Sequence, residues 1–215
     1  MAVPLYEALK SRIRRQAPYR WWCRRRAEAA MVSWLRASVS GPPPALFKQY
    51  LVRAYGSRFG AETLVETGTY LGEMVEASAS HFRNVYTIEL DPSLHRRAVS
   101  RLGHLPNVTF LLGDSGSILS DVLRQVSGPA VFWLDGHYSG GVTARGEDDT
   151  PVLRELAQIF AANRSGDVLL IDDARCFDGR NDYPTIEALV HLLEQTLGGV
   201  VNVADDVVRA TPGWL

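Results

Sequence analysis

The chain has 215 residues, 46% of them hydrophobic, and a formal net charge of −1 at pH 7, the composition of one globular domain with a sizeable core. It contains no run of about 18 apolar residues, so we expect no membrane span, and its charged, aromatic beginning does not resemble a secretory signal. The two cysteines, Cys23 and Cys176, lie far apart, and we expect free thiols in a reducing cytoplasm.

The beginning of the chain differs from the rest in charge. Residues 1–44 carry nine Lys or Arg against two Glu, a net of +7, whereas residues 45–215 carry 14 against 22, a net of −8. We therefore predict a basic, aromatic-rich helical extension over 1–44 and a second domain over 45–215. Basic residues interleaved with tryptophan suit an arm for nucleic acid or an anionic membrane. We favour helices that pack on the acidic domain or on a second subunit, and we expect a homodimer without a nucleic-acid partner.

From Thr63 onward, apolar runs alternate with helical stretches. The expected strands are the run that begins at Thr63 and ends at the turn of Gly68, then 84–91, 108–114, 130–136 and 167–174. The expected helices are 72–82, 93–102, 115–126, 151–162 and 184–197. The strands are apolar on both faces, which is typical of a parallel sheet covered by helices, and 200–206 with 207–212 would close it as an antiparallel pair. The pattern predicts an α/β, Rossmann-like, doubly wound fold.

The first unit of this alternation carries the most informative pattern. The sequence TLVETGTYL at 63–71 is followed by Gly72, and the next strand, NVYTIELD at 84–91, ends in acidic residues. Glu89 lies 21 residues after Gly68. This is the layout of a nucleotide-binding βαβ unit, in which glycines admit a ligand to a helix N-terminus and the acid accepts hydrogen bonds from ribose hydroxyls. The dinucleotide pattern G-x-G-x-x-G and a second binding half are missing, which disfavours a dehydrogenase.

The segment from Glu66 to Gly72 reads E-x-G-x-x-x-G and resembles motif I of the class I S-adenosylmethionine (SAM) methyltransferases. The usual form is E/D-x-G-x-G-x-G, so Tyr70 stands where glycine is commoner. The resemblance covers roughly residues 62–212 and implies a mostly parallel sheet with a C-terminal antiparallel pair and helices on both faces.

The same resemblance implies a SAM site. Glu66 would bind the ammonium group of the cofactor, Glu89 its ribose and Asp114 its adenine amine. The other expected cofactor contacts are Thr67, Gly68, Thr69, Tyr70, Gly72, Ser115 and Asp135. An ordinary helix N-cap is the alternative role for Asp114, and it stays open.

Acidic residues also end the fourth and fifth strands. Asp135 follows the fourth, and the pair Asp172-Asp173 follows the fifth. Neighbouring parallel strands lie about 4.8 Å apart, so these carboxylates would crowd one volume and repel one another unless a cation neutralises them. Mg²⁺, or another divalent cation, suits such oxygen ligands. The layout resembles the metal-dependent sugar O-methyltransferases of the macrocin type, which carry D-G-D on one strand and D-D on the next.

His137 stands where that pattern has its third acid. A neutral imidazole near Asp135 suits a general base that takes the proton of an acceptor hydroxyl, although a loop histidine can also bond backbone or bind the metal. The glycine-rich loop 136–150 suits a lid over the substrate. Tyr138, Arg145 and Arg175 are further candidates for contacts with the acceptor.

We therefore predict a SAM-dependent O-methyltransferase that acts, with Mg²⁺, on a hydroxyl of a small polar acceptor, a sugar or a glycosylated metabolite. The chain is also similar in size and style to the small 1-O-methyltransferases of methylmannose-polysaccharide synthesis. An N-methyltransferase acting on tRNA or another nucleic acid is the alternative. Only the basic extension supports it, and D-G-H-Y stands where N-P-P-Y is usual for amino-group acceptors. A non-catalytic relative of this fold is disfavoured by the intact cofactor acids.

Overall fold

A computed structural model describes residues 17–37, 41–136 and 150–213 of the chain. The chain divides into two compact units, residues 1–48 and 49–215, and each is described by itself. Over the described ranges, every helix is too short or too polar to cross a lipid bilayer.

The first unit contains helix α2 (Ala17–Arg36) and the start of α3 (Ala45–Phe59). Trp34 is buried, packs on the ring of Phe47 at 4.8 Å between centroids, and donates its indole N–H to the carbonyl of Gly41 at 3.2 Å. Trp21 and Trp22 are exposed, and the guanidinium groups of Arg25 and Arg26 lie over their rings.

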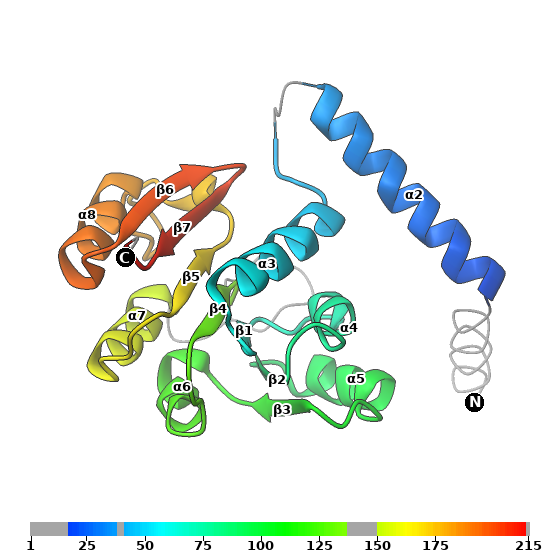
Figure 1. The fold of residues 1–215 in the computed structure, drawn as a ribbon, viewed down its shortest axis with the longest axis horizontal. Coiled ribbons are helices and arrows are strands. Elements are labelled where there is room, and N and C mark those ends of the chain that lie inside the picture. The colour runs from blue at the N-terminus through cyan, green and yellow to red at the C-terminus, as the bar shows by residue number, and fades with distance from the viewer. Residues whose placement is uncertain (1–16, 38–40, 137–149, 214–215) are drawn as a thin grey trace. The chain divides into compact units, whose positions relative to one another are not determined.

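The second unit is built on a seven-stranded sheet with the order β3-β2-β1-β4-β5-β7-β6, which Figure 1 shows as a twisted layer. Its strands are β1 (Thr63–Thr67), β2 (Asn84–Glu89), β3 (Val108–Leu112), β4 (Ala130–Leu134), β5 (Val168–Ile171), β6 (Val200–Ala204) and β7 (Val207–Thr211). Strands β1 to β5 run parallel, whereas β7 pairs antiparallel with both β5 and β6.

Helices cover both faces of the sheet. They are α4 (Glu73–Ser78), α5 (Pro92–Leu102), α6 (Ser115–Leu123), α7 (Val152–Ala161) and α8 (Ile186–Leu197), with a short 3₁₀ helix η1 (Ala174–Cys176) after β5. Side chains of α3, α4 and α5 share one buried cluster with alternate strand residues such as Leu64 and Trp133. Side chains of α6, α7 and α8 share the opposite cluster with Val65 and Phe132. Successive strand residues therefore contribute side chains alternately to two hydrophobic clusters, one on each face of the sheet. For this reason the central strands are apolar on both faces.

The fold class is as the sequence predicts, with three local differences. The chain leaves the helical path after Ser78, well before the expected end at residue 82, and Phe82 turns inward to pack on Gly56, where an added Cβ would lie 2.7 Å from its ring. Strands β3 and β6 lie at the sheet edges and stay half exposed, so they are not buried on both faces. Helix α3, which the sequence pattern did not indicate, contributes Val52 to the core.

The strand register brings the carboxyl ends of four strands together. Thr67 at the end of β1 is level with Ile88 of β2 and Leu134 of β4, and Leu134 is level with Ile171 of β5. The residues that follow these four strands therefore lie side by side at the carboxyl ends of the strands, where open α/β sheets bind their ligands. We call this region the carboxyl edge of the sheet.

Candidate functional site

The turn after β1 is held against the end of β4. Gly68 has a φ of +83°, and a Cβ there would lie 2.4 Å from the backbone oxygen of Asp135. Gly72 has a φ of +73° and begins α4, and a Cβ there would lie 2.7 Å from Leu102. Both glycines therefore have packing reasons within the protein, beyond any need to admit a ligand.

Glu66 lies under this turn and is 2% exposed. It is level with Thr87 of β2, whose hydroxyl donates to its Oε2 at 2.5 Å, and Thr69 lies at the same distance from the Thr87 hydroxyl. Burial raises the pKa of Glu66 to about 8, and the charges of Asp135 and Glu89 add to the rise, against the hydrogen bond from Thr87. Asp135 and Glu89 are thus close enough to Glu66 to disfavour its ionisation.

Glu89, at the end of β2, is also buried, and it ties two loops together. Its Oε2 accepts the backbone N–H of Tyr70 at 2.7 Å, and its Oε1 accepts that of Asp91 at 2.9 Å. Tyr70 adopts a left-handed conformation with a φ of 48°, which is uncommon for a residue with a bulky side chain, and its ring is half exposed. The predicted ribose acid therefore lies beside the glycine turn, with its orientation fixed by two donors.

Asp114 is the N-cap of α6, the alternative that the sequence left open. Its carboxylate accepts the N–H of Gly116 at 3.0 Å, the hydroxyl of Ser117 at 3.2 Å and the guanidinium of Arg154 at 2.7 Å. Burial opposes the charged form, but Arg154 and the cap outweigh it and lower the pKa of Asp114. Since a carboxylate offers about four acceptor positions, one remains for a further donor such as an adenine amine.

The three acids after β4 and β5 come together as predicted. Asp135, Asp172 and Asp173 each offer a carboxylate oxygen, and these oxygens lie within 4.8 Å of one another. Asp172 and Asp173 are buried, and Asp135 is half buried. A Mg²⁺ octahedron with bonds of about 2.1 Å separates its ligands by about 3–4 Å, so these oxygens would have to draw slightly closer to share one ion. Carboxylate oxygens are the ligands that a hard divalent cation prefers.

Other predicted site residues divide into two groups. Arg175 lies at the acidic cluster, where its guanidinium donates to Asp173 at 2.8 Å and also pairs with Asp206. His137, Tyr138 and Arg145 lie outside the described residues, as does most of the expected lid, loop 136–150.

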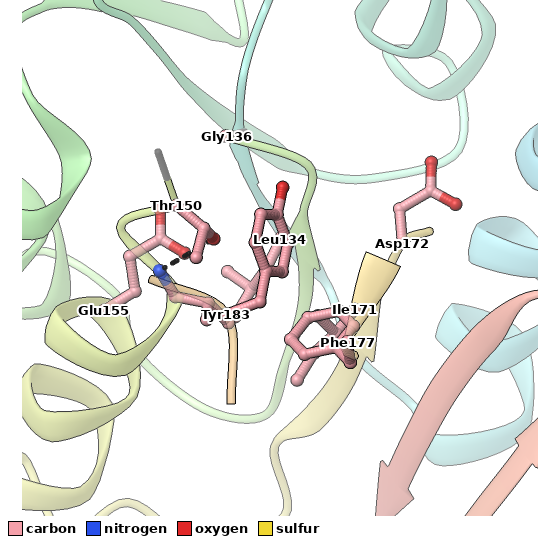
Figure 2. A pocket seen from close by; sticks show the side chains of 9 residues that line it. Leu134, Gly136, Thr150, Glu155, Ile171, Asp172, Phe177 and Tyr183 are labelled. Atoms are coloured by element: carbon pink, nitrogen blue, oxygen red, sulfur yellow. Dashed lines mark hydrogen bonds between the residues drawn. The ribbon is translucent and has the colours of Figure 1, made fainter. Parts of the chain in front are cut away.

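The sequence did not single out Glu155 of α7, which is 1% exposed. It lines a small pocket with Gly136, Thr150 and Asp172, and Figure 2 shows Glu155 and Thr150 on one side of this pocket and Asp172 on the other. Among the residues that the structure describes, its Oε1 has no hydrogen-bond partner, and it would lie 3.2 Å from a Cβ on Gly136. Burial raises the pKa of Glu155 to about 7, against hydrogen bonds with the side chains of Ser115 and Thr67.

A signal for Glu155 exists in the sequence. The apolar residues Val152, Leu156 and Ile159 recur at helical spacing, and Glu155 falls within the same stripe. A carboxyl on the apolar face of a helix is expected to be buried, and here it lies near Thr67 at the end of β1, Gly136 after β4 and Ser115 at the start of α6.

Comparisons with known proteins identify the fold. No protein-family model and no curated protein matches the sequence. Among solved structures, the O-methyltransferase from Bacillus cereus in complex with SAH has a TM-score of 0.56 and 13% identity, covering 86% of this chain and 90% of that one. TomG of Streptomyces achromogenes, an O-methyltransferase of tomaymycin synthesis solved with SAM, has a TM-score of 0.54 and 15% identity over 87% and 89%. NodS of Bradyrhizobium japonicum, an N-methyltransferase, has a TM-score of 0.52 and 17% identity over 78% and 95%.

At these identities the likeness shows the fold alone, a Rossmann-like sheet that these methyltransferases share, and it confirms the predicted fold class. Because proteins named as O- and N-methyltransferases share it, the fold by itself does not distinguish the acceptor atom.

The buried carboxyl of Glu155 predicts a pH dependence of stability. Its pKa rises from 4.5, the ordinary value, to about 7 in the native state, so the native protein holds this proton over a range where the unfolded chain has lost it. Its contribution to the free energy of unfolding therefore falls as pH rises from about 4.5 to about 7, by about 3 kcal/mol in all. Urea denaturation should show Glu155→Gln gaining about 2 kcal/mol relative to wild type between pH 5 and pH 8.

The matched control is Glu187→Gln, which changes an exposed acid in the first turn of α8 and should show no such gain. A difference between Glu155→Gln and wild type that stays constant with pH would mean that Glu155 is already ionised in the native state.

Proposed function

We propose that this protein is a SAM-dependent O-methyltransferase that acts, with Mg²⁺ or another divalent cation, on a hydroxyl of a small polar acceptor. The observation that carries the proposal is the placement of three acids, Glu66, Glu89 and Asp135, around the β1–α4 turn, at the carboxyl ends of the strands where open α/β sheets bind ligands. Glu66 and Glu89 are buried and Asp135 is half buried, and closely placed acids of this kind are suited to a cationic ligand. SAM carries both an ammonium and a sulfonium group.

Each cofactor contact has a support in the geometry. Glu66 is a buried acceptor for the ammonium group, and Glu89 is pre-oriented for the ribose hydroxyls by its two backbone donors. Asp114 is proposed to accept the adenine amine on its remaining position, beside Ser115. Thr67, Thr69, Tyr70 and the two glycines form the turn over which the methionine moiety lies.

A divalent cation is proposed at Asp135, Asp172 and Asp173. When bound there, it supplies Lewis-acid activation of the acceptor oxygen. The three carboxylates would bind it and hold its position between β4 and β5. His137, two residues after Asp135, is proposed to take the proton of the acceptor hydroxyl.

The acceptor class rests on the resemblance of D-G-H and D-D at these two strand ends to the macrocin-type sugar O-methyltransferases. We therefore propose a sugar or a glycosylated metabolite. The acid cluster favours this assignment over an N-methyltransferase, because an amine needs no metal to become a nucleophile once it is deprotonated.

The cofactor site makes a prediction for binding. Glu89→Ala should weaken the binding of SAM, measured by calorimetry, by about 1.5–3 kcal/mol, the loss of a hydrogen bond to a charged group. The control is Glu62→Ala, which removes an exposed acid just before β1, at the opposite edge of the sheet. Equal affinities of Glu89→Ala and wild type, or no SAM binding by the wild type, would rule out the proposed site.

The chemistry makes a prediction for turnover. Methyl transfer from SAM to a panel of sugars and other hydroxylated metabolites should stop in excess EDTA and recover with Mg²⁺. Asp172→Asn should depress turnover far more than SAM affinity, because the proposed SAM contacts lie mainly on β1 to β3. His137→Ala should lower turnover by about 10²–10⁴, the usual loss for a positioned base.

Two results would contradict this chemistry separately. Full activity in EDTA would remove the metal from the proposal, and an active His137→Ala enzyme with an unchanged pH profile would remove the base. Methylation of tRNA in preference to the hydroxylated panel would favour the N-methyltransferase alternative.

We also propose that residues 1–44 form a packing or dimer element, and that the protein works as a homodimer in the cytoplasm. The exposed Trp21 and Trp22 support an association surface, and the free Cys23 and Cys176 support a reducing compartment.

Ultracentrifugation should find a dimer for the full chain and a monomer after deletion of residues 1–44. Binding of RNA by the full chain at physiological salt, with a steep salt dependence and loss on deletion, would contradict this assignment and indicate a nucleic-acid arm.

A further inference from the structure

The β6–β7 turn is bonded to the turn that carries Asp173. Asp206 lies in the β6–β7 turn, 33 residues after Asp173 in the sequence. It is close to Asp173 in space because Val208 of β7 pairs with Ile171 of β5. The carbonyl of Asp206 accepts the N–H of Ala174 at 2.8 Å, and its Oδ1 accepts the N–H of Arg175 at 2.8 Å. Its Oδ2 pairs with the guanidinium of Arg175. One residue of the hairpin thus makes three bonds to the two residues that follow Asp173.

Those bonds act where the backbone is unusual. Asp173 adopts a left-handed conformation, with φ of 55° and ψ of 49°. Such a conformation is less favourable for a residue with a Cβ and persists where the surroundings fix it. The bonds from Asp206 hold Ala174 and Arg175 in place, and so they fix the path of the backbone at Asp173, just after β5.

Arg175 links the two carboxylates. The same nitrogen, Nη1, bonds Oδ1 of Asp173 at 2.8 Å and the carboxylate of Asp206, and both carboxylates are only 10% exposed. Because one guanidinium is shared by two carboxylates, the positive charge of Arg175 only partly offsets the negative charge of Asp173. A carboxylate held in this way is oriented toward Asp135 and Asp172 and keeps negative charge for a cation.

We infer that Asp206 is a positioning residue for the divalent cation proposed at Asp135, Asp172 and Asp173. It acts through Arg175 and the turn at 173–175, without ligating the ion itself. The inference rests on the proposed function, and it makes the C-terminal hairpin part of the metal site. Nothing in the local sequence around Asp172-Asp173 indicates this contribution.

The test is Mn²⁺ binding to the full-length protein, followed by the EPR signal of free Mn²⁺ in the absence of SAM and acceptor. Asp206→Asn should weaken binding by about 10- to 100-fold, the usual effect of removing a partner of a metal ligand. Asparagine tolerates the left-handed conformation of this position, where φ is 60°, so the substitution mainly removes charge. The matched control is Asp205→Asn, since Asp205 is left-handed too but pairs with Arg209. It should leave Mn²⁺ affinity unchanged.

Arg175→Gln is a second variant, for the case in which Asp206→Asn does not fold. Removing a positive charge beside the acids should tighten Mn²⁺ binding if electrostatics alone matter, whereas loss of positioning should weaken it. Weakening supports the inference and tightening overturns it. Equal affinity of Asp206→Asn and wild type also overturns it and leaves the metal site standing. Absence of Mn²⁺ binding by the wild type overturns both this inference and the proposed metal site.

Discussion

Carboxylates are concentrated at one edge of a parallel sheet, and the structure around that edge compensates for their repulsion. Glu66 near the end of β1, Glu89 at the end of β2 and the pair Asp172-Asp173 after β5 are buried. Asp135, which follows β4, lies between the acids of β1 and β5 in the order of the sheet. Four of these carboxylates accept a hydrogen bond from a hydroxyl, a backbone N–H or a guanidinium: those of Glu66, Glu89, Asp172 and Asp173. Even so, the pKa of Glu66 stays near 8, mainly through burial, so hydrogen bonding does not remove the cost of ionising this acid. A cationic ligand would.

Backbone strain is found at the same edge. Most of the non-glycine residues with positive φ among the described ranges are Asn or Asp, which tolerate this region, and Tyr70 is the exception. The conformation of Tyr70 directs its N–H to Glu89, and that of Asp173 is fixed by the hairpin that carries Asp206. Unfavourable backbone conformations that are held in place by such hydrogen bonds are typical of functional sites.

The sequence predicted the features that depend on local pattern. The strand ends, the glycine turn and the meeting of Asp135 with Asp172 and Asp173 all follow from βα alternation and from the parallel register of neighbouring strands. The residues that reach the site from distant parts of the sequence could not be predicted from these local patterns. Arg154 and Glu155 reach the site from α7, and Asp206 reaches it from the β6–β7 turn, because of helix packing and antiparallel pairing that no local spacing encodes. Asp114 shows the consequence: its cap and its Arg154 contact leave less of its carboxylate for adenine than the motif alone suggests.

If the buried acids at the strand ends are matched to a cationic cofactor, the binding of SAM should change the protonation of Glu66. With a pKa of about 8, Glu66 is mostly protonated at pH 7 in the ligand-free protein, and it must ionise to bind an ammonium group. Calorimetry at pH 7 in two buffers of different ionisation enthalpy should therefore show release of roughly one proton per SAM bound. The release should disappear in Glu66→Gln. SAM binding without proton release by the wild type, or with the same release in Glu66→Gln, would contradict this account.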